Sequence, residues 1–94
     1  MTEETSPWWV YLLQCSDQTL YAGITTDLQR RIQEHNGATS GGARYTRSRR
    51  PVRLVWFEPS KSRSAASQRE ATIRKLTHAQ KERLIRAVVG DPSR

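Results

Sequence analysis

The chain has 94 residues and a formal net charge of +7, a length that suits one domain with one core. No apolar run approaches the roughly 20 residues of a membrane-spanning helix, and the polar, acidic segment 1–7 does not resemble a signal peptide. The single cysteine, Cys15, excludes an internal disulfide and suits a reducing cytoplasm, so we expect a cytoplasmic protein without membrane association.

The positive charge comes mainly from arginine, which outnumbers lysine by thirteen to three. The planar guanidinium group matches phosphate better than an ammonium group does. A basic surface binds nucleic acid by releasing counterions from the phosphates, so nucleic acid is the partner that charge favours. An acidic membrane surface and an acidic protein are the alternatives on charge alone.

Two apolar segments, 8–15 and 20–25, predict strands joined by a polar turn. The first segment is apolar at both alternating sets of positions, which predicts a central strand covered on both faces. We therefore expect a hairpin near the start of the chain, at the centre of the sheet.

The register of this hairpin decides where Tyr11, Tyr21 and Gly23 point. Side chains alternate between the faces of a sheet, so an odd number of turn residues places all three on one face. We predict a three-residue turn, 17–19, which sets Tyr11 opposite Thr25.

The next segment predicts a helix that begins at Thr26 and ends at the Asn36-Gly37 pair, because Gln29 has the capping-box spacing from Thr26. Arg31 and His35 are four residues apart, which makes them neighbours on one face of this helix.

Residues 38–50 show no periodicity and predict a mobile, basic loop. Pro51 fits the start of a third strand over 52–57, which Pro59 ends.

Ser62 is a plausible cap for a helix over 63–76, in which Glu70 lies near the buried edge. Thr77 with Gln80 begins a last helix that runs to Val89. We expect a single domain over 8–90, with tails at 1–7 and 91–94.

These elements predict an α/β (α+β) fold, a three-stranded and mainly antiparallel sheet with helices on both faces. Two tyrosines in a hairpin, an arginine ten residues after the second, and a later helical glutamate resemble the GIY-YIG nuclease family. The resembling residues are Trp9-Val10-Tyr11, Tyr21-Ala22-Gly23, Arg31, His35 and Glu70. The chain is most similar to the small, single-domain bacterial members, although Trp9 stands where the family motif has glycine.

The resemblance implies a hydrolysis of phosphodiester bonds with Mg²⁺ (or Mn²⁺) as cofactor. Glu70 would hold the metal, since Mg²⁺ needs few protein carboxylates, and Arg31 would clamp the scissile phosphate. An ion pair of Glu70 with Arg69 or Arg74, and a solvated Arg31, are the plain structural alternatives.

The resemblance also implies roles for the aromatic residues. Tyr11 would act as the base or relay for the attacking water, and Tyr21 would orient that water or contact the phosphate. His35 could carry protons instead, because its usual pKa suits neutral pH, or be a helix-end charge. Gly23 would allow a close approach, with a simple bulge as the alternative.

The basic loop supplies the candidate nucleic-acid contacts, with arginines for phosphates and a tyrosine that could stack on a base. These residues are Arg44, Tyr45, Arg47, Arg49 and Arg50.

The first functional hypothesis is a monomeric, Mg²⁺-dependent nuclease that acts on DNA by structure rather than by sequence, because no recognition helix is evident. The alternative is a nucleic-acid-binding module with little or no turnover. A protein-interaction domain with incidental basic charge is the third.

Overall fold

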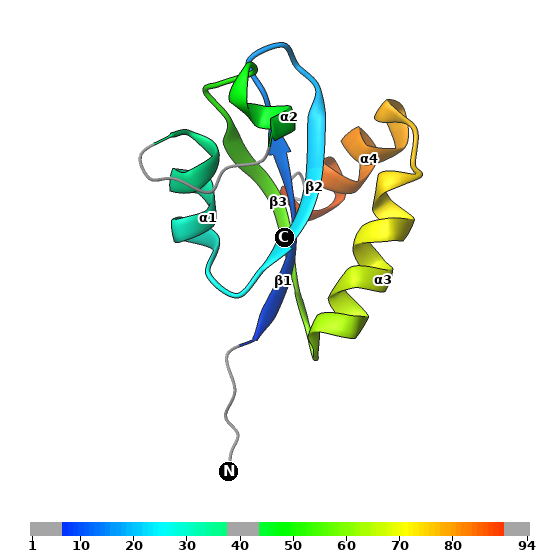
Figure 1. Ribbon diagram of the computed structural model, residues 1–94. Coiled ribbons are helices and arrows are strands. Elements are labelled where there is room, and N and C mark those ends of the chain that lie inside the picture. Colours follow the sequence, from blue (N-terminus) through cyan, green and yellow to red (C-terminus); the bar gives the residue numbers. More distant parts are fainter. Residues whose placement is uncertain (1–6, 38–43, 90–94) are drawn as a thin grey trace.

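Three antiparallel strands in the order β2-β1-β3 form the sheet in a computed structural model that describes residues 7–37 and 44–89. The strands are β1 (Trp8–Gln14), β2 (Leu20–Thr25) and β3 (Arg53–Ser60). The helices are α1 (Leu28–His35), α2 (Arg44–Arg47), α3 (Arg63–Arg74) and α4 (His78–Val89) (Figure 1). The predicted fold class and the central position of the first strand are confirmed. Apart from Pro7, the expected tails lie outside the described residues.

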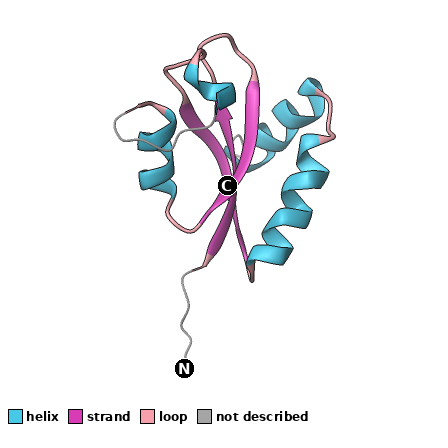
Figure 2. Ribbon diagram, viewed as in Figure 1, coloured by secondary structure: helices cyan, strands magenta, loops and turns pink. Residues whose placement is uncertain are grey.

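Helices cover both faces of the sheet (Figure 2). On one face, Leu28 and Ile32 of α1 pack against Tyr11 and Leu13 of β1. On the other face, α3 and α4 enclose an apolar core made of Val10, Leu12, Ala22, Trp56, Ala66 and Ile73. Successive residues of β1 therefore enter two different cores, which explains why the whole strand is apolar.

The hairpin between β1 and β2 differs from the prediction in length. Gln14 pairs with Leu20, so the connection has five residues, 15–19, and Tyr11 lies opposite Gly23 rather than Thr25. Gln18 adopts a left-handed φ of 73° within it. The alternation of side chains fixes only whether the number of loop residues is odd or even. The predicted odd number was therefore right, whereas the predicted register was wrong by two residues.

The helix α1 begins one residue later than predicted. Asp27, not Thr26, is the N-cap, and its carboxylate accepts a hydrogen bond from the backbone N–H of Arg30. The predicted end is confirmed, with Asn36 as C-cap and Gly37 at a φ of +87°. The Asn36 side chain donates to the Val52 carbonyl oxygen (2.9 Å) and accepts from the Val52 N–H (2.7 Å), which fastens α1 to the start of β3.

Two predictions for the middle of the chain were wrong. Part of the predicted loop is the one-turn helix α2, which is too short to show periodicity in the sequence; residues 38–43 lie outside the described residues. Pro59 does not end the third strand but lies inside β3, opposite Trp9. Since β3 is an edge strand, a proline without an N–H is tolerated there.

Caps fix both C-terminal helices where the sequence predicted them. The Ser62 hydroxyl oxygen accepts from the Ala65 N–H at the start of α3, which ends at Arg74, two residues earlier than expected. Thr77 and Gln80 exchange reciprocal hydrogen bonds of 2.9 and 3.1 Å, so the capping box is confirmed. Within residues 7–37 and 44–89, none of the helices has the length and apolar character that crossing a membrane requires.

Candidate active site

Tyr11, Tyr21 and Gly23 lie on the face of the sheet that α1 covers. Tyr11 pairs with Gly23 and Leu13 pairs with Tyr21, so the register confirms that the three share one face. The Tyr11 ring lies across Gly23, because a Cβ added there would be 2.5 Å from the Tyr11 Cζ atom. A glycine is therefore needed at this position, and a simple bulge does not account for it.

The Tyr11 hydroxyl group is the centre of a buried polar network. It lies 3.0 Å from His35 Nε2 and accepts a hydrogen bond from Arg31 Nε at 3.4 Å. The other ring nitrogen of His35, Nδ1, lies 2.8 Å from the Thr46 hydroxyl oxygen. Tyr11 is 2% exposed, and His35 and Thr46 are fully buried. The helices α1 and α2 thus bring Arg31, His35 and Thr46 to one phenol.

Burial keeps both Tyr11 and His35 neutral at neutral pH. Desolvation raises the pKa of Tyr11 to about 12, although the Arg31 guanidinium opposes this rise. Desolvation, together with the positive charge of Arg31, lowers the pKa of His35 to about 4. The expectation that His35 titrates near neutral pH, or serves as a helix-end charge, was therefore wrong, since the sequence did not reveal that its ring is enclosed.

Neutral His35 can donate from either ring nitrogen, and the Tyr11 oxygen can accept a second hydrogen bond besides that from Arg31. We assign the tautomer in which the Tyr11 hydroxyl group donates to His35 Nε2. His35 then carries its proton on Nδ1 and donates it to the Thr46 oxygen. Nε2 is left as a proton acceptor aimed at the Tyr11 hydroxyl.

Arg31 lies at the rim of this network, between the buried phenol and solvent. Its side chain is 26% exposed and its Nη1 is 2.7 Å from a carboxylate oxygen of Glu34. The side chain of Arg30 is 55% exposed, in line with its position about 100° around the helix. Arg31 is thus positioned to reach both the Tyr11 hydroxyl and an incoming anion.

The residues expected to bind nucleic acid fall into two groups. The Tyr45 ring stacks on Tyr21 with centroids 5.4 Å apart, and the Arg49 Cζ atom lies 4.1 Å from the Tyr45 centroid on α2. Arg49 also pairs with Asp17, and Arg50 donates to the His35 carbonyl oxygen. These three residues are therefore engaged within the protein, whereas Arg44 and Arg47 are exposed on α2.

Glu70 lies on α3, the helix that covers the opposite face of the sheet. Its side chain is only 13% exposed, which agrees with the predicted position near the buried edge, and its carboxylate pairs with Arg74. Arg74 and Tyr21 line the same pocket beside β2, so the two sides of the sheet approach each other at this strand. The structure thus brings Tyr11, Tyr21, Arg31 and His35 together, with Glu70 on the other side of β2.

The described residues contain few side chains that could bind a divalent metal. No group of three His, Cys, Asp or Glu side chains suited to a metal occurs in the part of the chain that the structure describes. Mg²⁺ keeps several waters and uses one or two carboxylates with substrate phosphates. Glu70 fits such an ion as a single ligand once its carboxylate separates from Arg74.

Thr46 is a site residue that the sequence did not single out. It follows Tyr45 in a stretch of arginines, where nothing in the pattern marks it as buried. Its role becomes visible only when α2 places its hydroxyl on His35.

Comparison with known proteins assigns most of the chain to one family. The family model described as the GIY-YIG catalytic domain matches residues 7–83. A UPF0213 protein of Desulfotalea psychrophila is 55% identical over 80 residues, which cover 85% of this chain and 72% of that protein. A UPF0213 protein of Natronomonas pharaonis is 50% identical over 87% of this chain and 94% of its own length.

Two solved structures are similar along nearly the whole chain. The solution NMR structure of a UPF0213 protein from Bacillus halodurans has a TM-score of 0.55 and 39% identity, over 93% of this chain and 89% of that one. The solution NMR structure of a protein from E. faecalis has a TM-score of 0.60 and 34% identity, over 96% of this chain and 94% of that one.

Proposed function

Because the chain belongs to the GIY-YIG family, we propose that it is a divalent-metal-dependent endonuclease that hydrolyses phosphodiester bonds in DNA. The observation that supports this best is the convergence of Arg31 Nε and His35 Nε2 on the Tyr11 hydroxyl oxygen. A phosphate beside this group would meet a guanidinium for charge and a phenol backed by a proton acceptor. We further propose that it acts as a monomer in the cytoplasm.

Arg31 binds the scissile phosphate in this proposal. Its guanidinium lies at the rim of the network and is already oriented by Tyr11 and Glu34. A fixed guanidinium stabilises the charge that develops on the phosphoryl oxygens as water attacks. Tyr21, half-buried beside His35, contacts the same phosphate or the water.

Tyr11 and His35 act as a proton relay. A phenol with a pKa of about 12 does not ionise by itself at neutral pH. When the attacking water gives its proton to the Tyr11 oxygen, the phenol proton passes to His35 Nε2, 3.0 Å away. The water oxygen forms the new bond to phosphorus, the bond to the 3′ oxygen breaks, and that oxygen takes a proton from solvent. His35 returns its extra proton to solvent through the Tyr11 hydroxyl group, because burial favours the neutral ring.

The cofactor in this proposal is Mg²⁺ or Mn²⁺, with Glu70 as its protein ligand. When bound, such an ion neutralises charge on the phosphate and on the leaving oxygen. Glu70 must exchange its ion pair with Arg74 for this role.

Selection by DNA structure rather than base sequence follows from the shape of the surface. The helix that carries the candidate contacts Arg44 and Arg47, α2, has only four residues and cannot fill a major groove as a recognition helix does. Phosphate contacts position a strand without reading its bases.

A cleavage assay tests the proposal. End-labelled single-stranded, flapped and branched DNA would be incubated with the protein and Mg²⁺, with EDTA as the control. We expect strand cleavage that EDTA abolishes and that Glu70→Gln loses while binding persists. Failure of the wild-type protein to cut any DNA or RNA with Mg²⁺ or Mn²⁺ would refute a nuclease.

A second candidate is a nucleic-acid-binding module with little or no turnover. It is favoured by two observations: the Tyr11 ring is 2% exposed, and the Glu70 carboxylate is already neutralised by Arg74. Wild-type protein that binds DNA with a steep salt dependence but cuts nothing would establish this candidate instead.

A further inference from the structure

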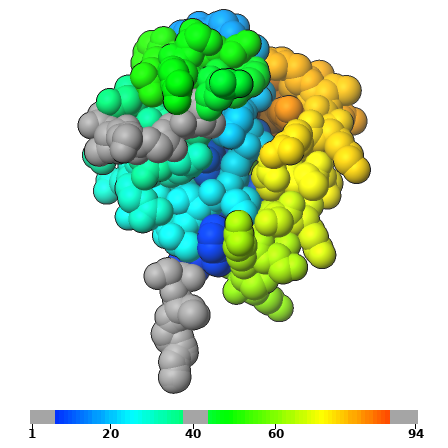
Figure 3. Space-filling view, viewed as in Figure 1, coloured from blue at the N-terminus to red at the C-terminus, as the bar shows by residue number. Residues whose placement is uncertain are grey.

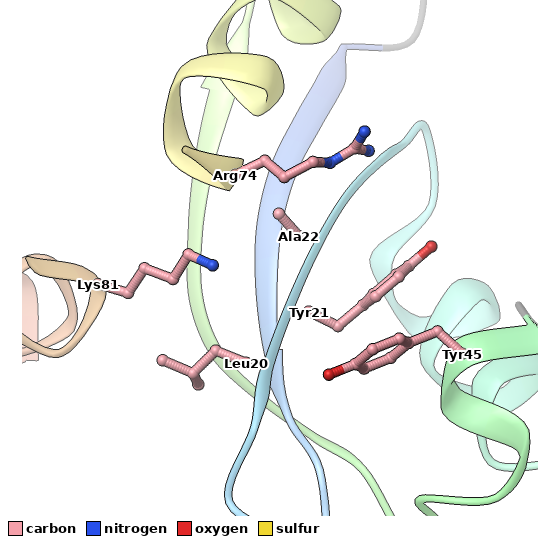
Figure 4. A pocket seen from close by; sticks show the side chains of 6 residues that line it. All are labelled: Leu20, Tyr21, Ala22, Tyr45, Arg74 and Lys81. Atoms are coloured by element: carbon pink, nitrogen blue, oxygen red, sulfur yellow. The ribbon is translucent and has the colours of Figure 1, made fainter. Parts of the chain in front are cut away.

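A pocket of about 220 Å³ lies beside β2, apart from the Tyr11 hydroxyl network. Figure 4 shows its lining residues, which come from β2, α2, α3 and the start of α4: Leu20, Tyr21, Ala22, Tyr45, Arg74 and Lys81. Because β2 is an edge strand, this pocket is reached from outside the sheet. In the space-filling view, β2 (cyan) reaches the surface between α2 and α3 (Figure 3).

The pocket holds two cations, of which Arg74 is paired with Glu70 and Lys81 keeps its charge uncompensated within the described part of the chain. Arg74 and Lys81 extend toward β2 from two different helices, and none of the six lining residues is acidic (Figure 4). Lys81 is half-buried, and among residues 7–37 and 44–89 no acidic side chain pairs with its ammonium group. An ammonium group without a counter-charge beside it favours the binding of an anion.

Tyr45 adds a fixed hydrogen-bond donor to these cations. Its hydroxyl group points toward β2 and the pocket (Figure 4). Its ring stacks on Tyr21 and contacts the Arg49 guanidinium, and these two contacts hold the hydroxyl group in this direction. A guanidinium, an ammonium and a phenol around one space match the oxygens of a phosphodiester.

We propose that this pocket binds a second phosphate of the nucleic-acid strand, next to the scissile one and on the α3 side of β2. The proposal rests on the proposed function, because Arg31 takes the scissile phosphate. Tyr21 belongs to both places, so the strand crosses the exposed edge of β2 from the α1 side to the α3 side. Lys81 and Arg74, which the sequence did not mark as nucleic-acid contacts, are then strand-binding residues.

The test measures strand binding rather than cleavage, so that it is independent of turnover. A short, fluorescein-labelled oligo-dT strand is titrated with the protein in EDTA over a series of salt concentrations and followed by fluorescence anisotropy. Lys81→Gln is compared with Lys75→Gln, which removes the same charge from an exposed position outside the pocket. Lys81 is a cleaner probe than Arg74, whose loss would also release the Glu70 carboxylate.

We expect Lys81→Gln to weaken strand binding several-fold and to reduce the slope of log K against log salt by about 0.7, the value for one phosphate contact to a single strand. Lys75→Gln leaves the slope unchanged. Lys81→Arg restores the wild-type slope, which, together with unchanged circular dichroism spectra, excludes misfolding.

Three outcomes would overturn the proposal. If Lys81→Gln binds like wild type while Arg31→Gln binds weakly, the pocket takes no strand phosphate and the proposed function stands. If inorganic phosphate binds to the wild-type protein but not to Lys81→Gln, while strand affinity is the same for both, the pocket holds free anions only. If the wild-type protein binds no strand at all, the proposed function fails together with the pocket.

Discussion

The two faces of the sheet are built from alternate residues of one strand, yet they differ in kind. Val10 and Leu12 enter a core whose buried members are all apolar. Tyr11 enters the opposite side, where His35 and Thr46 are fully buried polar residues. Each of these buried polar groups has a hydrogen-bond partner, as the high energetic cost of an unpaired one requires.

This difference separates stability from chemistry within a small domain. The α3 face stabilises the fold by burying apolar surface, and apolar contacts do not depend on a particular orientation. The α1 face holds its side chains by directional bonds, which fixes a proton acceptor against a phenol. Mutations on the first face should therefore change only the free energy of unfolding, whereas mutations on the second should also change activity.

The largest expected effect is on stability, from Ile73→Ala. Ile73 is fully buried in the apolar core, and truncation there should lower the free energy of unfolding by about 4 kcal/mol, from lost burial and the cavity left behind. Urea denaturation measures it, with the exposed neighbour variant Thr72→Ala as control. A fall in the cleavage rate per folded molecule would show that the two faces are coupled.

Acid should destabilise the α1 face through His35. Its pKa is about 4 in the folded protein and 6.5 ordinarily, so the unfolded chain binds a proton first as the pH falls. The stability that depends on a neutral His35 is fully present above pH 6.5. As the pH falls from 6.5 to 4, the free energy of unfolding decreases by about 3 kcal/mol. Urea midpoints at several pH values measure it, and His35→Gln should remove this part of the slope. If the pH dependence of stability in His35→Gln equals that of the wild type, another group is responsible for it.

Arg31→Ala should change activity without changing stability much. Removing a charge-stabilising donor costs about 10²-fold in rate, and the side chain is partly exposed. Single-turnover cleavage measures the loss. The matched control is Arg30→Ala, because Arg30 also pairs with Glu34 but is more exposed. Equal losses in both variants would mean that total charge matters and position does not.

The smallest effect is expected from Thr46→Val, which keeps the shape of the side chain but removes the acceptor for His35 Nδ1. Loss of this buried bond should cost about 1 kcal/mol of stability. Nitrogen NMR of the His35 ring should show a changed tautomer population, and Thr46→Ser should restore it. An unaltered ring spectrum would show that Thr46 does not orient His35.

The sequence predicted the sheet well because alternation and caps are local signals. Ser62 and the Thr77–Gln80 pair were located correctly, whereas Asp27 and Thr26 are both good caps and only the folded backbone decides between them. The parity of the hairpin followed from alternation, but its length depended on Gln18 accepting a left-handed conformation.

The candidate site was less predictable because it depends on which side of the sheet each helix covers. Helical spacing correctly placed Glu70 near a buried edge, but the face that α3 covers is set by tertiary packing. For His35, the sequence showed the residue type and its neighbour Arg31. The pKa of about 4 arises from burial under a four-residue helix that has no periodic signal.

The two hydrogen bonds between the Asn36 side chain and the Val52 backbone have a consequence for the chemical ageing of the protein. An asparagine followed by glycine loses its amide readily, because the next backbone nitrogen can attack the side-chain carbonyl without steric hindrance. In the folded chain, that carbonyl is held by the Val52 N–H and turned toward β3. The aspartate produced by deamidation could no longer donate to the Val52 oxygen, so α1 would be loosened where it carries His35. Folding thus protects Asn36, whose deamidation would displace His35.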